Sequence, residues 1–103
     1  MERDYCKFPG LCIGQIVRAR AGREKGLFMI VTEVIDENFV LLSDGDHRKF
    51  ISPKKKKIKH VLKTNIICSD IAASIADGSI TDKRIRDALS KFNYPNKEKG
   101  DQK

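Results

Sequence analysis

The stretch that decides the fold runs over residues 13–35 and reads IGQIVRARAGREKGLFMIVTEVI. Its centre, AGREKG at residues 21–26, is a charged loop that begins and ends near a glycine and lies between two strand-like runs. Glycine adopts positive φ without a Cβ clash, so two glycines allow a sharp turn and a close approach of the backbone to a ligand. The stretch therefore predicts a β-hairpin with Arg23 and Lys25 at its tip, within reach of a polyanion.

Strand-like segments continue on both sides of this hairpin. The segment 13–20 alternates apolar residues with arginines, whereas 27–35 is apolar on both faces and rich in β-branched residues, as in a central strand. Further strands are expected over residues 39–42, 47–51 and 58–62. Short strands at this spacing predict a mainly β fold, a small bent barrel of five strands.

After residue 64 the period of the apolar residues changes from that of strands to that of helices. Ser69 and Asp70 can cap a short first helix that ends before Gly78, and Thr81 can cap a second. The second helix carries an amphipathic stripe at i, i+3, i+4, i+7: Ile85, Ala88, Leu89 and Phe92. We expect this stripe to pack on the barrel or over its open end, the other interpretation being that it docks a partner.

These patterns divide the 103 residues into one domain with extensions. The expected parts are an N-terminal arm over 1–12, the barrel over 13–63, two short C-terminal helices over 64–94 and a disordered polar tail over 95–103.

The positive charge is concentrated in one segment. The net charge is +7, and residues 47–69 hold eight Lys and Arg side chains and no acidic one, while the rest of the chain holds 13 basic and 14 acidic residues. Pro53 is expected to break strand pairing, which leaves residues 54–57 as an exposed connection. A charge run is often only a solvated loop. Beside a cationic hairpin it indicates a surface for a phosphate backbone or an anionic membrane.

From about Gly14 to Leu62 the chain resembles the KOW motif of ribosomal proteins and transcription elongation factors. In the usual pattern a further glycine follows the Lys-Gly pair by three residues, and here that position is Met29. The L-fourteen-e type of ribosomal protein also lacks this glycine, and its pattern continues with Val-Ile-Asp and a later Asp-Gly, as residues 34–36 and 44–45 do here. The chain is thus similar to short bacterial KOW-domain proteins related to that type.

This resemblance implies an SH3-like barrel that binds RNA, above all ribosomal RNA, as a ribosomal or ribosome-associated protein of the translation machinery. The chain has no Trp, and Phe50 is the one aromatic residue interleaved with basic residues, so we expect recognition of folded RNA by shape and phosphates. The candidate RNA-binding residues are Arg18, Arg20, Gly22, Arg23, Lys25, Gly26, Arg48, Lys49, Lys54, Lys55, Lys56, Lys57, Lys59, His60 and Lys63.

Other function classes find little support in the sequence. No nucleotide-binding fingerprint or nucleophile elbow is present, so we expect no enzyme and no cofactor. The cysteines and histidines lack metal-ligand spacing, which favours reduced thiols over a metal site. A cytoplasmic monomer that contacts RNA and ribosomal proteins but no membrane is the expected form. An SH3-like protein-interaction module of the transcription or translation machinery is the alternative, and membrane binding by the lysines is a weaker one.

Overall fold

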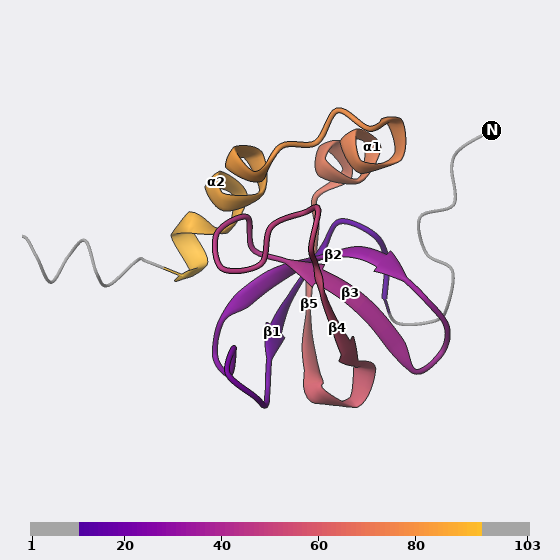
Figure 1. Cartoon of the computed structure of the whole chain (residues 1–103), viewed down its shortest axis with the longest axis vertical. Helices are drawn as coiled ribbons and strands as arrows, with labels where there is room; N and C mark the ends of the chain where they lie inside the picture. The colour runs from indigo at the N-terminus through magenta and orange to yellow at the C-terminus, as the bar shows by residue number, and fades with distance from the viewer. Residues whose placement is uncertain (1–10, 94–103) are drawn as a thin grey trace, which may run out of the picture.

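The computed structural model describes residues 11–93 as an antiparallel five-stranded sheet with two helices packed against it (Figure 1). The elements in chain order are β1 (Gln15–Ala19), β2 (Phe28–Val34), β3 (Phe39–Ser43), β4 (Lys54–Lys57), a 3-10 turn η1 (Ile58–His60), β5 (Val61–Ile67), α1 (Ser69–Asp77) and α2 (Asp82–Asn93). The mainly β fold with two short C-terminal helices is confirmed. The strand order is β4-β3-β2-β1-β5, so β4 and β5 are edges and the bent sheet does not close into a ring.

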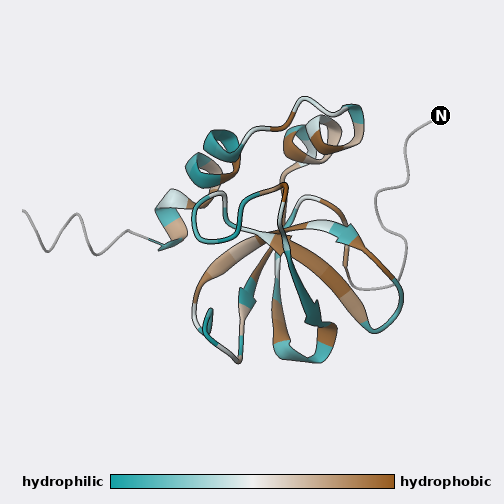
Figure 2. Ribbon diagram, in the orientation of Figure 1, coloured by the Kyte–Doolittle hydropathy of each residue, from teal (hydrophilic) through white to brown (hydrophobic). Residues whose placement is uncertain are grey.

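The central strand β2 is buried on both faces, as its sequence predicts. Met29 and Val31 face one hydrophobic cluster, together with residues of β1 and β3. Ile30 faces a second cluster, which the helices complete with Ile71 and Ile85. Figure 2 shows hydrophobic colour along this strand and on the sides of both helices that face the sheet. Two apolar faces on one strand thus place the sheet between two small cores.

Helix α2 packs within the chain. Ile85 and Leu89 are fully buried in the second cluster, and Ala88 and Phe92 pack against it. The hydroxyl of Thr81 accepts a hydrogen bond from the backbone N–H of Arg84 (3.2 Å), so the expected cap is confirmed. The interpretation of the stripe as a core-facing surface is therefore confirmed.

Polar contacts at both ends of α2 add to this apolar packing. Asp82 Oδ1 accepts the backbone N–H of Phe50 (2.7 Å). At the other end, the Asn93 amide accepts the N–H of Phe28 (2.8 Å) and donates to its carbonyl oxygen (3.1 Å), as a neighbouring strand would. The helix is thereby fixed to both the β3–β4 loop and β2.

The expected strand over 47–51 and the expected connection over 54–57 are both wrong. Residues 47–51 belong to a loop, because the Asp44 carboxylate accepts the backbone N–H of Asp46 (3.0 Å) and of Arg48 (2.7 Å) in place of a strand partner. The lysines instead form β4, which pairs with β3. An exposed sheet edge tolerates lysines because their charges discourage further pairing.

Smaller differences concern the element boundaries. β5 runs to Ile67, beyond the boundary expected after Lys63, and the helix α1 begins at Ser69 without a side-chain cap. Leu11 and Cys12, expected in the arm, are buried. The rest of that arm, and the expected tail, lie outside the described residues.

The cysteines differ from the expectation of reduced thiols at one position. Cys12 is disulfide-bonded, whereas Cys68 carries a free thiol. Burial and then the nearby Asp70 raise the pKa of Cys68, against the opposing effect of Lys91. A raised pKa means less of the nucleophilic thiolate at neutral pH.

Gly45 lies where the β3–β4 loop touches α2, and its replacement tests that contact. Its φ is +78°, and an added Cβ would meet the carbonyl oxygen of Asp82 and lie 3.0 Å from the backbone nitrogen of Arg86. We expect Gly45→Ala to lower the free energy of unfolding by about 2 kcal/mol or more, because backbone strain adds to displacement of the helix.

Gly78 is the matched control, since its φ is +83° but an added Cβ would meet nothing within 4 Å. Gly78→Ala should cost about 1 kcal/mol. Urea denaturation measures both, and equal losses would contradict a role for the contact.

Candidate nucleic-acid interface

The loop between β1 and β2 is the tight hairpin that the sequence predicts. Gly22 and Gly26 both have left-handed backbone conformations, with φ of +84° and +88°. The N–H of Lys25 donates to the carbonyl oxygen of Gly22 (3.1 Å), and the N–H of Gly26 donates to that of Ala19 (2.8 Å). These bonds close the loop on itself and present its tip to solvent.

Side chains at the tip point in two directions. Arg23 and Lys25 are exposed, and neither makes an ion pair or side-chain hydrogen bond with the residues described in 11–93. Glu24, between them, is 8% exposed. The tip therefore offers two unpaired cations while its one acid is turned inward.

Glu24 joins the hairpin loop to two other segments. Its Oε1 lies 3.4 Å from Lys56 Nζ on β4, and its Oε2 lies 3.3 Å from Arg48 Nε in the β3–β4 loop. Lys56 Nζ also donates to the carbonyl oxygen of Ala21 (2.8 Å). Burial alone would raise the pKa of Glu24, but the hydrogen bonds from Arg48 and Lys56 outweigh it and hold the pKa below its usual value. The carboxylate is thus ionised and fixes the loop in place.

Lys56 is not the solvent-exposed cation that the sequence predicts. It is 8% exposed, and it pairs across β4 and β3 with the fully buried Val40. Partners in an antiparallel ladder point to the same face, so the stem of Lys56 covers the first hydrophobic cluster. Lys55 and Lys57 point to the opposite face and are exposed. The candidate Lys56 is therefore structural.

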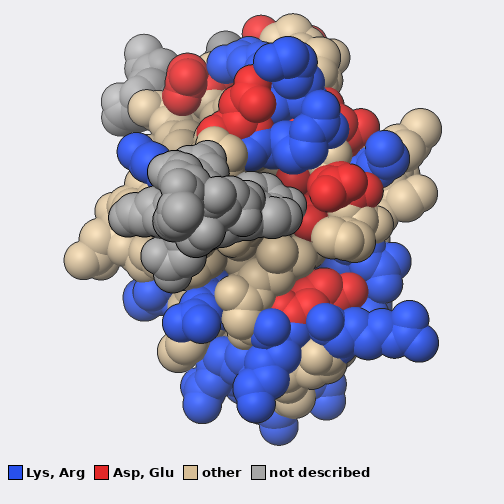
Figure 3. All heavy atoms as spheres, turned by 90° about the vertical axis from the view of Figure 1, so that its left-hand side faces the viewer, with Lys and Arg blue, Asp and Glu red and all other residues tan. Residues whose placement is uncertain are grey.

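The fold brings two basic segments to one end of the molecule. The N–H of Arg20, at the base of the hairpin, donates to the carbonyl oxygen of His60 (2.8 Å), and Lys56 reaches the loop from β4. We call the exposed cations of residues 18–25 and 54–63 the basic end. Figure 3 shows Lys and Arg gathered there in the lower part of the view, whereas toward the top Lys and Arg alternate with Asp and Glu. Residues 69–93, which include both helices, hold four acidic and four basic side chains, so this part of the chain adds no net charge.

The structure sorts the remaining candidates by exposure. Arg18 is exposed but partly engaged, since its Nε donates to the carbonyl oxygen of Gly26 (3.3 Å) and its guanidinium lies over the Phe28 ring. Phe50 is half-buried, and its ring is partly covered by the second hydrophobic cluster. The exposed candidates are Arg18, Arg20, Gly22, Arg23, Lys25, Lys49, Lys55, Lys57, Lys59 and Lys63, and the half-buried ones are Gly26, Arg48, Lys54 and His60.

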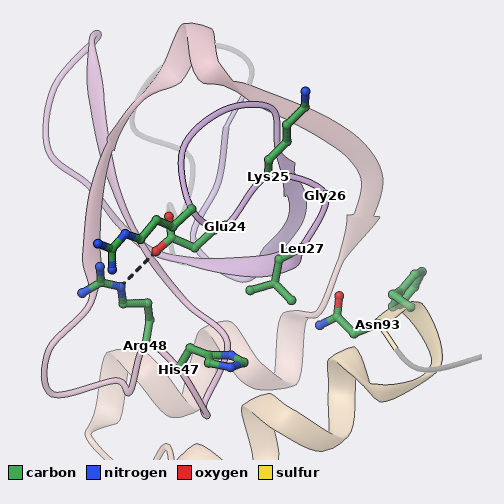
Figure 4. Close-up of a pocket in the computed structure, with 9 residues that line it drawn as sticks. Glu24, Lys25, Gly26, Leu27, His47, Arg48 and Asn93 are labelled. Carbon is green, nitrogen blue, oxygen red and sulfur yellow. Dashed lines mark hydrogen bonds and ion pairs between the residues drawn. The ribbon is translucent and has the colours of Figure 1, made fainter. Parts of the chain in front are cut away.

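A hollow of about 540 Å³ lies beside the hairpin tip (Figure 4). The hairpin loop, His47 and Arg48 of the β3–β4 loop, and Phe92 and Asn93 of α2 line it. No signal in the sequence indicated Glu24, because its partners Arg48 and Lys56 come from other segments of the chain. None indicated His47 either, because the residues that surround the hollow beside it come from the hairpin loop and α2.

The described part of the chain has neither a metal-binding cluster nor a helix fit to span a membrane. Residues 11–93 contain no group of three or more His, Cys, Asp or Glu side chains that could hold a metal ion. Over the same residues, neither helix has the length and apolar character that crossing a bilayer requires.

Three relatives of this chain are named as ribosomal or candidate ribosome-binding proteins, and none of the three is named as an enzyme. No protein-family model matches the chain. It is 37% identical over 57 residues to the large ribosomal subunit protein eL14 of Desulfurococcus amylolyticus, covering 55% of this chain and 59% of that one. It is 34% identical over 53 residues to eL14 of Staphylothermus marinus, covering 52% and 55%. The chain thus spans less than two thirds of the length of either eL14 protein.

A match of greater coverage comes from Bacillus subtilis strain 168. Its protein YbzG, named as a candidate ribosome-binding protein, is 31% identical over 70 residues, which are 67% of this chain and 95% of YbzG. This coverage, together with the hairpin, the five strands and the similarity to eL14, shows that the chain belongs to the family of eL14-like KOW proteins that includes YbzG.

Proposed function

We propose that the protein associates with the ribosome in the cytoplasm and binds ribosomal RNA through its basic end. The observation that carries this proposal is the convergence of two cationic segments, residues 18–25 and 54–63, at the end of the molecule away from the helices. Of the cations in these segments, Lys56 alone forms an ion pair with a described residue. The names of the relatives, ribosomal protein eL14 and a candidate ribosome-binding protein, support the same conclusion.

The chemistry of this surface suits phosphates better than bases. Arginine offers a planar fork for bidentate contact with a phosphate, whereas lysine acts as a point charge. Phe50 is half-buried against the second hydrophobic cluster, and residues 18–25 and 54–63 contain no aromatic ring besides that of His60, so the basic end lacks the row of aromatic rings that single-strand binders use. Phosphate contacts fix the position of a protein on folded RNA without reading the RNA sequence. The expected ligand is therefore a helical or compact element of ribosomal RNA, bound by the monomer.

The hairpin tip provides the first test. Arg23→Ala combined with Lys25→Ala should weaken binding to a ribosomal RNA fragment and flatten the slope of log K against log salt by about 1.8, since each lost phosphate contact changes it by about 0.9. The melting temperature should stay nearly unchanged, because exposed charges contribute little to stability. Fluorescence anisotropy titrations at several salt concentrations measure the slope.

A pair of exposed cations in the first turn of α2 is the matched control. Lys83→Ala combined with Arg84→Ala removes the same charge, and neither residue lines the hollow beside the hairpin tip. This pair should leave both the affinity and the slope unchanged. A large fall in melting temperature with unchanged affinity in the hairpin variant would mean that the loop is only structural.

A second candidate function is contact with a ribosomal protein. A groove of about 550 Å³ lies between β5 and the helices and contains Ile66, Ile71 and Phe92. On β5 itself, Leu62, Ile66 and Ile67 are 42–47% exposed, which is unusual for apolar strand residues. If this surface contacts a ribosomal protein, Ile66→Asp should reduce co-sedimentation with ribosomal subunits while leaving the affinity for naked RNA unchanged.

A further inference from the structure

The hollow beside the hairpin tip has the size of a ligand site. Its volume of about 540 Å³ lies within the range of about 300–1,000 Å³ that small-molecule sites occupy. Three separate segments line it: the hairpin loop, the β3–β4 loop and the last residues of α2. Arg23 and Lys25 are among the residues that line it, so an RNA bound to the basic end would lie next to its opening.

An exposed histidine is fixed at this hollow. The side chain of His47 is 70% exposed, and its Nδ1 lies 3.4 Å from Oδ2 of Asp44, whose own side chain is 2% exposed. Asp44 also holds the backbone of the loop, and Gly45 is anchored to α2 because its carbonyl oxygen accepts a hydrogen bond from Arg86 (2.9 Å). Figure 4 shows the His47 ring on one side of the space and Leu27 on the other. A flat ring opposite an apolar side chain suits a flat aromatic ligand.

A cation is fixed at the wall of the same hollow. Arg48 donates from Nε to Glu24 (3.3 Å), which holds the guanidinium in place. Its side chain is 36% exposed, and this is the one hydrogen bond of its guanidinium to the described residues, so its other N–H groups are available for an anion. The Asn93 amide, in contrast, is occupied by the backbone of Phe28 through both its oxygen and its nitrogen. The hollow thus offers a stacking surface and a phosphate donor, and no free amide to read the edge of a base.

We propose that this hollow binds one unpaired nucleotide of the RNA, with its base stacked on the His47 ring and its phosphate on Arg48. The proposal rests on the proposed function, because the RNA that lies on the basic end delivers the nucleotide. Unpaired nucleotides are what proteins recognise by stacking in structured RNA. Because every base has a π-face, this stacking accepts any base.

The experiment compares three RNA duplexes that differ at one position. The first is fully paired, the second has one unpaired adenosine, and the third has an abasic site in place of that adenosine. The wild-type chain should bind the second on the order of tenfold more tightly than the other two, the gain expected for one stacked base. His47→Ala should abolish this difference and His47→Phe should preserve it. Lys83→Ala, which removes a side chain outside the hollow and outside the basic end, should leave it intact.

The outcomes separate the two proposals. If the wild-type chain binds all three duplexes equally, with the salt dependence of phosphate contacts, the nucleotide site is overturned and RNA binding by the basic end stands. If His47→Ala keeps the preference for the unpaired adenosine, the stacking role of His47 is overturned. If no duplex binds in a salt-dependent way, the proposed function fails and the nucleotide site fails with it.

Discussion

Glu24→Ala is expected to lower the free energy of unfolding by about 3 kcal/mol, a typical cost of removing one partner from a buried ion pair. The variant leaves Lys56, which is 8% exposed, without its carboxylate. The carbonyl oxygen of Ala21 still accepts from Lys56 Nζ, and this remaining contact keeps the loss near the lower end of the usual range. Urea denaturation at neutral pH measures the change.

The same variant should also weaken RNA binding. Removing a negative charge from a basic surface would by itself strengthen attraction to a polyanion. However, Glu24 connects the hairpin loop to β4 and to Arg48, so its loss releases the loop that presents Arg23 and Lys25. We expect the loosened hairpin loop to weaken binding by more than the removal of the Glu24 carboxylate strengthens it. The sign of the change in RNA affinity distinguishes the two effects.

Two control variants isolate the role of this ion pair. Glu33 on β2 is exposed and has no ion-pair partner among the described residues, so Glu33→Ala should change stability by less than about 0.5 kcal/mol. Glu24→Leu combined with Lys56→Met replaces both charges by apolar groups and should restore most of the lost stability. An increase in RNA affinity of folded Glu24→Ala would contradict the positioning role of Glu24.

Acid should weaken the fold partly through this residue. The pKa of Glu24 is lower in the folded chain than its usual value of about 4.3. A lowered folded pKa stabilises the fold fully at pH values above the unfolded pKa, and this contribution disappears as the pH falls through the folded pKa. Stability should therefore decline less steeply between neutral and acidic pH in Glu24→Gln than in the wild-type chain. If the free energies of unfolding of the two proteins fell in parallel with pH, this contribution of Glu24 would be contradicted.

Substitution of Lys54, Lys55, Lys57 and Lys59 by serine should flatten the salt dependence of RNA binding by about three units of slope. Each phosphate neutralised on a duplex releases counterions worth about 0.9 in the slope of log K against log salt, so three or four contacts give this change. The loss of binding affinity should be similar for unrelated RNAs, since phosphate contacts carry no sequence information. Titrations of two unrelated duplexes at several salt concentrations check both statements.

Lys56 supplies the control for the lysine variant. It belongs to the same run, but it is buried against Glu24 and does not face solvent. Lys56→Met should therefore reduce stability while leaving the salt slope of the folded protein unchanged. An unchanged slope in the fourfold serine variant would show that these lysines are merely solvated, and the contact surface would then have to lie on the arginines of the hairpin.

Local patterns along the chain determined most of the fold. The doubly apolar run at 27–35 indicated a central strand, and β2 is buried on both faces. The stripe from Ile85 to Phe92 indicated a helix that packs on the sheet, and α2 does so. The glycines around the hairpin loop adopt the left-handed conformations that the turn requires. These features follow from the sequence because neighbouring residues alone set the period of burial and the sign of φ.

Tertiary structure alone decided which charges are free to bind. Four consecutive lysines carry no periodic signal, so their sequence could not reveal that β4 pairs with β3 and turns Lys56 inward. Glu24 and Arg48 lie far apart along the chain, and their contact exists only because the sheet bends the hairpin toward the β3–β4 loop. The segment 47–51 was expected as a strand, but Asp44 and Asp82 supply its backbone with other partners. Residue type thus determined the total charge, whereas strand register and the reach of single side chains determined where that charge faces solvent.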